Sequence, residues 1–260
     1  MSSASTNPPR LALEHVSYGF GARVLQRGIS FSVQAGEVLC VIGGSGCGKS
    51  TLLRVLTGLL PPLEGRVLVE GRDLWAAEPD AQAALIRRFG MMYQGGALWT
   101  SMTLAENVCL PLALYTGLDA RSARNVAAYK LALVGLAGFE DFLPSEISGG
   151  MAKRAAIARA MALDPDILLL DEPSAGLDPV TSRRLDELIL ELRETLGMSF
   201  VIVTHELASV FRIADRIAYL DVASRSMTAL GPPRQLLAES SDAGLVAFLS
   251  GGERQPVAAS

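Results

Sequence analysis

Gly43-Gly44-Ser45-Gly46-Cys47-Gly48-Lys49-Ser50 is the stretch of this 260-residue chain that decides its fold. A continuous apolar run at residues 38–42 precedes it, and leucines at helical spacing follow it from residue 49 to residue 60. Pro61-Pro62 then predicts the end of that helix. A glycine, four residues and Gly-Lys-Ser between a strand and a helix form the pattern of a phosphate-binding loop, and a chance glycine turn is a poor alternative in this context.

The residue types in this loop match what bound phosphate requires. Glycines let successive backbone amides converge on phosphate oxygens, and the helix that begins near Lys49 adds its dipole. Lys49 is expected to contact the β- and γ-phosphates, and Ser50 to ligate magnesium. The expected nucleotide contacts of this stretch are Gly43, Gly44, Ser45, Gly46, Cys47, Gly48, Lys49, Ser50 and Thr51. Kinases, GTPases and motors share such a loop, so the class of NTPase has to be identified from the motifs that follow.

Two adjacent carboxylates follow a second buried strand. Residues 167–170 are four large aliphatics after Asp164-Pro165, which predicts a strand buried on both faces, and Asp171-Glu172 ends it. Ligands of parallel sheets bind at the carboxyl ends of the strands. We therefore expect Asp171 to hold magnesium, directly or through water, and Glu172 to act as the general base on the attacking water. The alternative is a solubilising pair at a strand end.

Ser148-Gly149-Gly150-Met151 precedes the helix expected at residues 152–163 and forms a second anion-binding helix start. One nucleotide has no use for two such sites in one chain. We therefore expect Ser148, Gly149 and Gly150 to address the γ-phosphate held by a second copy of the chain. Taken alone, the same residues would be an ordinary capped helix.

The rest of the chain predicts an α/β fold with a mainly parallel sheet. Half of the residues are apolar, so the chain can bury one large core. An almost wholly helical stretch, residues 104–163, places a helical insertion at about residues 95–160, inside the sheet-forming sequence. Further strands are expected at residues 11–14, 28–33, 65–71, 200–204 and 217–221, a short apolar segment at 89–93, and helices at 76–88, 182–196 and 207–214.

Composition excludes several classes of protein. A net charge of -4 provides no positive field for a nucleic-acid backbone. Residues 1–10 are polar, are expected to be flexible and contain no apolar signal region, and no run of about 18 apolar residues occurs, so we expect a soluble, intracellular chain. Cys40, Cys47 and Cys109 lack metal-ligand spacing and are expected to be free thiols. Cys47 lies beside a helix start, where a lowered thiol pKa and reactivity are expected.

Together these motifs resemble the nucleotide-binding domain of ATP-binding-cassette ATPases over residues 11–231. The resemblance implies a P-loop NTPase core with an antiparallel β edge, and ATP with Mg²⁺ as the ligands. It makes Gln94 the glutamine that senses magnesium and the permease, residues 174–178 the D-loop, and His205 the switch histidine at the γ-phosphate. Either Tyr18 or Phe20 would stack on adenine. Taken alone, Gln94 would be a turn residue and His205 a structural histidine.

Two segments resemble a narrower group. Ser148–Met151 resembles the signature motif of the family, but Ile147 and Met151 stand where that motif usually has leucine and glutamine. Met151 cannot make the hydrogen bonds of a glutamine amide, so contact with the partner's nucleotide must depend on Ser148 and backbone amides. Residues 147–160 and 93–108 are similar to ATPases that serve MCE-protein lipid transporters. The implied partners are a second copy, a transmembrane permease, an MCE-type substrate-binding protein and a small accessory subunit, without nucleic acid. The implied place is the cytoplasmic face of the inner membrane.

Two alternatives to a transporter subunit fit this sequence less well. Soluble cassette ATPases that act on nucleic acid or ribosomes generally carry coiled-coil or zinc insertions or two cassettes, which this sequence does not show. A catalytically dead cassette conflicts with the intact Lys49, Asp171, Glu172 and His205.

The tail at residues 232–260 is more apolar than a solvated end. Either a short helix at residues 243–249 folds back on its own chain, or Phe248 and Leu249 pack across the dimer.

Overall fold

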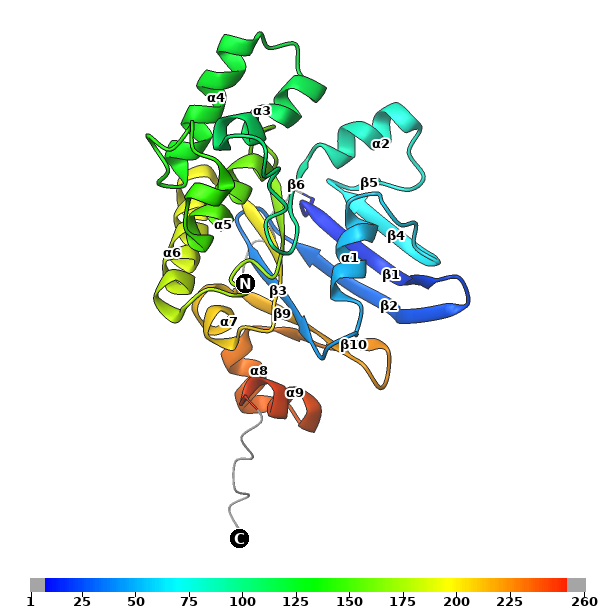
Figure 1. Cartoon of the computed structure of the whole chain (residues 1–260). Helices are drawn as coiled ribbons and strands as arrows, with labels where there is room; N and C mark the ends of the chain where they lie inside the picture. Colours follow the sequence, from blue (N-terminus) through cyan, green and yellow to red (C-terminus); the bar gives the residue numbers. More distant parts are fainter. Residues whose placement is uncertain (1–7, 252–260) are drawn as a thin grey trace, which may run out of the picture.

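Two β-sheets and the helices packed around them form the chain (Figure 1), which the computed structural model describes for residues 8–251. Residues 1–7 of the N-terminal segment expected to be flexible, and residues 252–260 of the tail, lie outside the described residues. Arg10, the last residue of that segment, is fixed by ion pairs to Glu70 at 2.6 Å and Asp166 at 3.1 Å. The ordered chain therefore begins before residue 11.

The larger sheet holds the strand and loop described first. Its spatial order is β10-β9-β3-β8-β7-β6, with β10 antiparallel to β9 and the other five strands parallel. The strands are β3 Val38–Gly43, β6 Phe89–Met92, β7 Ile167–Asp171, β8 Ser199–Val203, β9 Arg216–Asp221 and β10 Ser226–Gly231. β3, β7 and β8 are buried along their whole length, which confirms what their aliphatic runs predicted. Their carboxyl ends therefore lie side by side at one edge.

The smaller sheet is antiparallel, with the order β2-β1-β4-β5. Its strands are β1 Leu11–Phe20, β2 Arg23–Val33, β4 Glu64–Val69 and β5 Arg72–Asp73. The sequence predicted β1 and β2 too short, because register shifts near Val16 and Tyr18 interrupt the alternation of apolar and polar residues. The two strands are in fact one long hairpin that turns at Gly21, where φ is +54°.

α1, Lys49–Leu56, packs between the two sheets with all of its apolar side chains buried. The predicted end at residue 60 is wrong. Thr57 donates its hydroxyl to the carbonyl of Leu53 at 2.8 Å, and Gly58 has a φ of +77°, so the helix ends one turn early. The glycine, and not Pro61-Pro62, ends this helix.

The helical insertion is confirmed, although it is not one continuous helix. It contains α3 Leu104–Tyr115, α4 Ala120–Leu133, a 3₁₀ turn Pro144–Glu146 and α5 Gly149–Ala160, and the remaining helices before the tail are α2 Pro79–Ile86, α6 Pro179–Leu196 and α7 Leu207–Ile213. Thr103, Asp119 and Ser148 each cap a new helix with a side-chain oxygen, which accounts for the breaks. Figure 1 shows α3, α4 and α5 gathered at one end of the large sheet.

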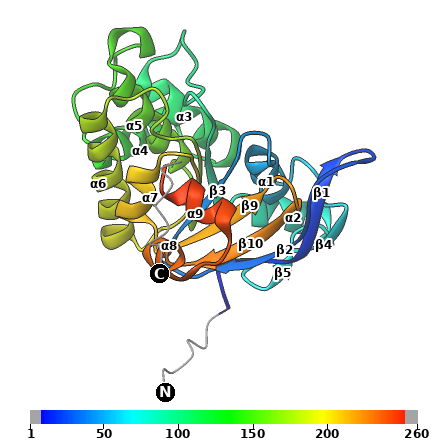
Figure 2. The same ribbon diagram turned by 90° about the horizontal axis from the view of Figure 1, so that it is seen from below.

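The described part of the C-terminal tail, up to residue 251, folds on its own chain. After β9 the chain forms the edge strand β10, then α8 Pro233–Glu239 and α9 Ala243–Leu249, and Figure 2 shows these two helices beside α7. Leu245 and Leu249 are buried, the latter 3% exposed, so the described residues adopt the first of the two alternatives for the tail. Between residues 8 and 251 no helix has both the length and the apolar character needed to cross a bilayer.

Candidate nucleotide-binding site

The carboxyl ends of β3, β7 and β8 surround a pocket of about 670 Å³. Residues 43–46 and 48–51 of the phosphate loop and α1 line it, together with Gln94, Glu172 and His205. The structure thus brings together side chains that are up to 162 residues apart, from Gly43 to His205. Leu25 and Phe248 also line the pocket, although no motif in the sequence indicated either residue.

The backbone of the loop is held open by close packing beneath it. A Cβ atom on Gly43 would lie 2.3 Å from the carbonyl oxygen of Leu220, so only glycine fits between β3 and β9. Gly48, with a φ of +97°, starts α1 without a side-chain cap. The side-chain Nε2 of Gln26 donates to the backbone carbonyl of Cys47 at 2.9 Å and holds the loop in place. The uncapped amides at the start of α1 therefore remain available to an anion.

Lys49 folds back over the loop. Its Nζ donates to the carbonyl oxygens of Gly43 at 2.8 Å and Gly44 at 3.2 Å. These carbonyl oxygens accept the hydrogen bonds that such a lysine donates to phosphate oxygens when phosphate is bound. The cradle therefore fits a phosphate chain, with Lys49 turning from the carbonyls toward it.

The residues beside Lys49 fit magnesium. The hydroxyl of Ser50 donates to Oδ1 of Asp171 at 3.2 Å, and burial raises the pKa of Asp171 against the opposing effect of that hydrogen bond. Gln94 lines the same pocket. A hydroxyl, a carboxylate and an amide oxygen are the hard oxygen ligands that magnesium prefers beside phosphate oxygens.

Glu172 and His205 form a pair at the mouth of the pocket. Oε1 of Glu172 lies 2.8 Å from Nδ1 of His205. Glu172 adopts a φ of +50°, which is strained for a side chain of this kind, and its amide donates to the carbonyl of Val203 at 2.8 Å. The strained turn directs the carboxylate from the end of β7 toward the loop that follows β8.

The two aromatic candidates for adenine stacking lie in different surroundings. Tyr18 is 0% exposed and packs under the phosphate loop, where a Cβ atom on Gly48 would lie 3.1 Å from its ring, so its assignment as an adenine contact is wrong. Phe20 is 48% exposed but does not line the pocket, and its contact with adenine stays a prediction.

The expected reactivity of Cys47 is also wrong. Its side chain is buried, and burial raises the pKa of the thiol although Lys49 acts to lower it. The helix start lowers a thiol pKa only where solvent reaches the sulfur, and here the sulfur faces Gly43.

Ser148 and Gly150 line a separate cleft of about 450 Å³ between α4, α5 and α6. Ser148 caps α5 by accepting a hydrogen bond from the amide of Met151 at 3.3 Å, which leaves its O–H free to donate elsewhere. Met151 packs against the core and lines the same cleft. The structure therefore does not bring this helix start to the phosphate loop of its own chain.

Two basic residues of α5 interact with residues at or next to the pocket, and no motif in the sequence indicated them. Arg159 donates to the carbonyls of Ala97 at 2.7 Å and Gly96 at 2.8 Å, three and two residues after Gln94. Lys153 is buried, which lowers its pKa, while the charge of Glu172 acts in the opposite direction. A charged residue on the inner face of an alanine-rich helix is the signal that could have indicated them.

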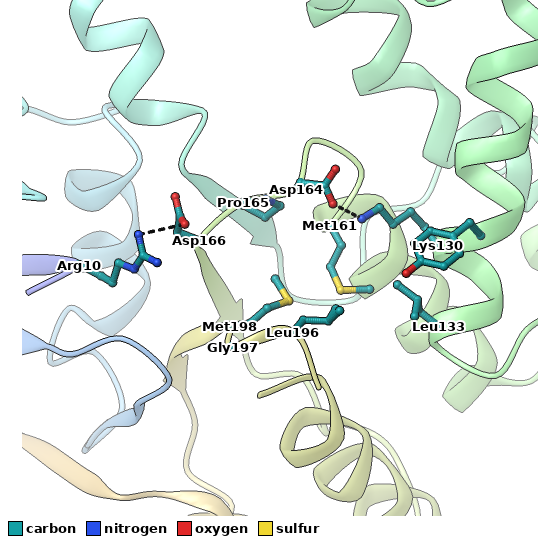
Figure 3. Close-up of a pocket in the computed structure, with 11 residues that line it drawn as sticks. Arg10, Lys130, Leu133, Met161, Asp164, Pro165, Asp166, Leu196, Gly197 and Met198 are labelled. Atoms are coloured by element: carbon teal, nitrogen blue, oxygen red, sulfur yellow. Dashed lines mark hydrogen bonds and ion pairs between the residues drawn. The ribbon is translucent and has the colours of Figure 1, made fainter. Parts of the chain in front are cut away.

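Figure 3 shows another pocket, of about 240 Å³, which lies where β7 begins and therefore at the opposite end of the strand from the phosphate loop. Its sides carry two ion pairs, Arg10 with Asp166 and Lys130 with Asp164. Since it shares no lining residue with the pocket at the phosphate loop, this pocket is not part of the nucleotide site.

Comparisons of sequence and of structure both match this chain to ATP-binding proteins of transporters. The family model described as ABC transporter matches residues 26–175. The chain is 37% identical to the "Intermembrane phospholipid transport system ATP-binding protein MlaF" of Haemophilus influenzae, over 96% of this chain and 94% of that protein. Among solved structures, cbiO1 from Clostridium perfringens, part of the ABC transporter complex cbiONQ, superposes with a TM-score of 0.80 at 27% identity, covering 89% of this chain and 92% of that one. The dimeric cassette MJ0796, bound to ADP and Pi in a post-hydrolysis state, gives 0.74 at 29% identity, over 85% and 98% of the two chains.

Proposed function

Because the chain belongs to the ABC transporter family, we propose that two copies close around two MgATP molecules and drive a phospholipid-transporting permease. ATP hydrolysis is the activity of this family of cassettes. Beyond ATP hydrolysis, we propose the composite site, the bound metal, the partners and the substrate.

The observation that supports a dimer is that the chain has two anion-binding helix starts which open into different pockets. One, at Lys49, opens into the nucleotide pocket, whereas the other, at Ser148, opens into a different cleft. Gly149 is exposed at the second start, so a second chain can approach its backbone. A second copy related by a two-fold axis would set each Ser148 against the phosphate loop of its partner, and a closed pair of this kind is a self-complementary interface.

Each residue of the pocket then has a step to perform. Lys49 and the loop amides bind the phosphates and orient the chain of the nucleotide. Ser50 and Asp171 would hold magnesium, whose charge offsets that of the β- and γ-phosphate oxygens. Glu172 takes a proton from the attacking water, and His205, 2.8 Å away, holds the carboxylate in position and reaches the γ-phosphate. Ser148 of the partner donates its hydroxyl to the charge that develops.

The surface for the permease is an apolar groove of about 490 Å³ beside Gln94. Tyr93, Trp99, Leu114 and Tyr115 line it and are all exposed, which is more apolar surface than a monomer ordinarily shows. Its floor is tied to the pocket by Arg159, which lines the groove and bonds to the loop after Gln94. A helix of a membrane protein seated here would move that loop, and with it Gln94.

The substrate and the remaining partners rest on the relatives. MlaF is named for intermembrane phospholipid transport, which supports a phospholipid as the substrate proposed for this chain. An MCE-type binding protein and a small accessory subunit are proposed from the resemblance of residues 93–108 and 147–160 to ATPases that serve such transporters. The chain would lie on the cytoplasmic face of the inner membrane, held there by its permease.

Co-purification from detergent-solubilised membranes tests this assembly. Tagged chain should bring down a multi-span membrane protein and phospholipid, which mass spectrometry identifies. Tyr115→Ala in the groove should lose both, whereas Tyr129→Ala should keep them, because Tyr129 is equally exposed, at 56% against 59%, and lies outside the groove. Recovery of ribosomal proteins or nucleic acid instead, or equal recovery with both variants, would contradict the assignment.

A further inference from the structure

α9 is seated firmly on its own chain. Asp242 caps it by accepting hydrogen bonds from the amides of Gly244 at 2.9 Å and Leu245 at 3.1 Å. The hydroxyl of Thr228 on β10 donates to the other oxygen of Asp242 at 2.8 Å. With Leu245 and Leu249 buried beneath it, the helix has a defined position.

This position brings Phe248 to the phosphate loop. Its ring packs on Tyr219 of β9, with ring centroids 5.7 Å apart and planes tilted by 51°. β9 runs directly alongside β3, where Leu220 is paired with Gly43. Phe248 therefore lies over the strand that adjoins the start of the loop, although it is 205 residues away from Gly43 in the chain.

Phe248 stands between two hollows. One is the nucleotide pocket, and the other is an outer hollow of about 590 Å³ that Tyr219, Val222 and Ala247 help to line. Gly44, His205 and Phe248 line both hollows. Of these three, only Phe248 has a large apolar side chain, so its ring is the apolar part of the boundary that the two spaces share.

The end of the pocket at this boundary is the one that would receive the γ-phosphate. Gly44 carries a carbonyl to which Lys49 donates, and His205 is paired with Glu172, the candidate base. Charge interactions strengthen where water is excluded, so a wall at this end acts on a terminal phosphate and hardly on the rest of the nucleotide.

We propose that Phe248 is a specificity-determining wall of the nucleotide site, closing its γ-phosphate end against the outer hollow so that the chain favours ATP over ADP. The proposal rests on the assignment of the pocket as the nucleotide site. It gives the tail a role within its own chain, because the wall depends on α9 being in place.

The test compares nucleotide affinities of Phe248→Leu, which opens the wall and keeps an apolar side chain. Calorimetric titrations use MgADP and a non-hydrolysable MgATP analogue, at chain concentrations where light scattering gives the monomer mass. We expect the analogue to bind about three- to tenfold more weakly and ADP to bind within twofold of the parent, since water regains access only to the terminal phosphate. Phe248→Tyr, which keeps the ring, should restore the parental ratio.

Phe211→Leu is the matched control, because Phe211 is a half-buried phenylalanine of α7 that packs on the same core without lining either hollow. It should leave the ratio of the two affinities unchanged, and ADP binding reports that each variant is folded. An unchanged ratio in Phe248→Leu, an equal loss for both nucleotides, or tighter binding of the analogue would overturn the proposal. If the parent bound neither nucleotide, the assignment of the pocket itself would be wrong.

Discussion

Replacing Gly149 with alanine should stabilise the fold but impair the proposed composite site. A Cβ atom added there would have Leu177 as its nearest neighbour, 3.9 Å away, and the backbone of Gly149 is not in the left-handed region. Gly149→Ala should therefore raise the free energy of unfolding by about 0.5–1 kcal/mol, because alanine loses less backbone entropy at a helix position. For a chain of this size that corresponds to a rise of about 1–3 °C in Tm.

The same methyl group would stand where the partner's phosphate must approach the amide of Gly149. We expect ATPase activity of the assembled complex to fall at least about tenfold, because a close backbone approach to phosphate leaves no room for a Cβ atom. Calorimetric ATP binding by the isolated chain should not change, since Gly149 is outside the nucleotide pocket of its own chain. Parental activity together with the higher Tm would refute the proposed contact.

Gly150→Ala is the companion variant. There the added Cβ atom would lie 2.4 Å from Cγ2 of Thr181, whose hydroxyl is held by Asp178 at 2.5 Å. This overlap should cost about 1–3 kcal/mol of stability, so Gly150→Ala lowers Tm where Gly149→Ala raises it. Equal shifts in Tm would show that the geometry of this helix start is misjudged.

Four further outcomes follow from the site. Glu172→Gln should keep ATP binding while single-turnover hydrolysis slows about 10²–10⁴-fold, and a parental rate would remove Glu172 as the base. Lys49→Ala should weaken binding of a fluorescent ATP analogue as well as turnover, because the lysine contacts phosphate in the ground state, and an unchanged affinity would contradict the cradle. Cys47 should resist iodoacetamide at neutral pH, because its raised pKa keeps the thiol protonated and its side chain is buried, and rapid labelling of native chain in mass spectra would contradict this. Truncation after Ser241 removes two buried leucines and should lower the denaturant midpoint of the monomer, with a gross loss of about 3–6 kcal/mol, whereas an unchanged midpoint would mean that the tail is not packed as described.

The sequence was informative wherever one motif determines its own surroundings. The loop from Gly43 to Ser50 requires a strand before it and a helix after it, and the aliphatic run of β7 requires burial on both faces. These local rules predicted the parallel sheet, the carboxylates at its edge and the inserted helices.

What the sequence did not show depends on packing between distant segments. Tyr18 could not be recognised as buried, because its burial results from the phosphate loop lying over β1 and not from any pattern around residue 18. Cys47 was judged from its neighbouring helix start, although desolvation is the larger effect on its thiol. Phe248 reaches the pocket only because β10 and α8 return the chain to β9, and β10 has the weak alternation of an edge strand.

The mass of the Glu172→Gln chain with and without ATP tests the central claim, that one chain's helix start at Ser148 completes the nucleotide site of another. Light scattering should give twice the chain mass with MgATP and the single mass with MgADP, and adding Gly149→Ala to the same chain should return it to the single mass while ATP still binds. A chain that binds ATP and remains a monomer, or a dimer that forms equally well with Gly149→Ala, would contradict a site shared between two copies.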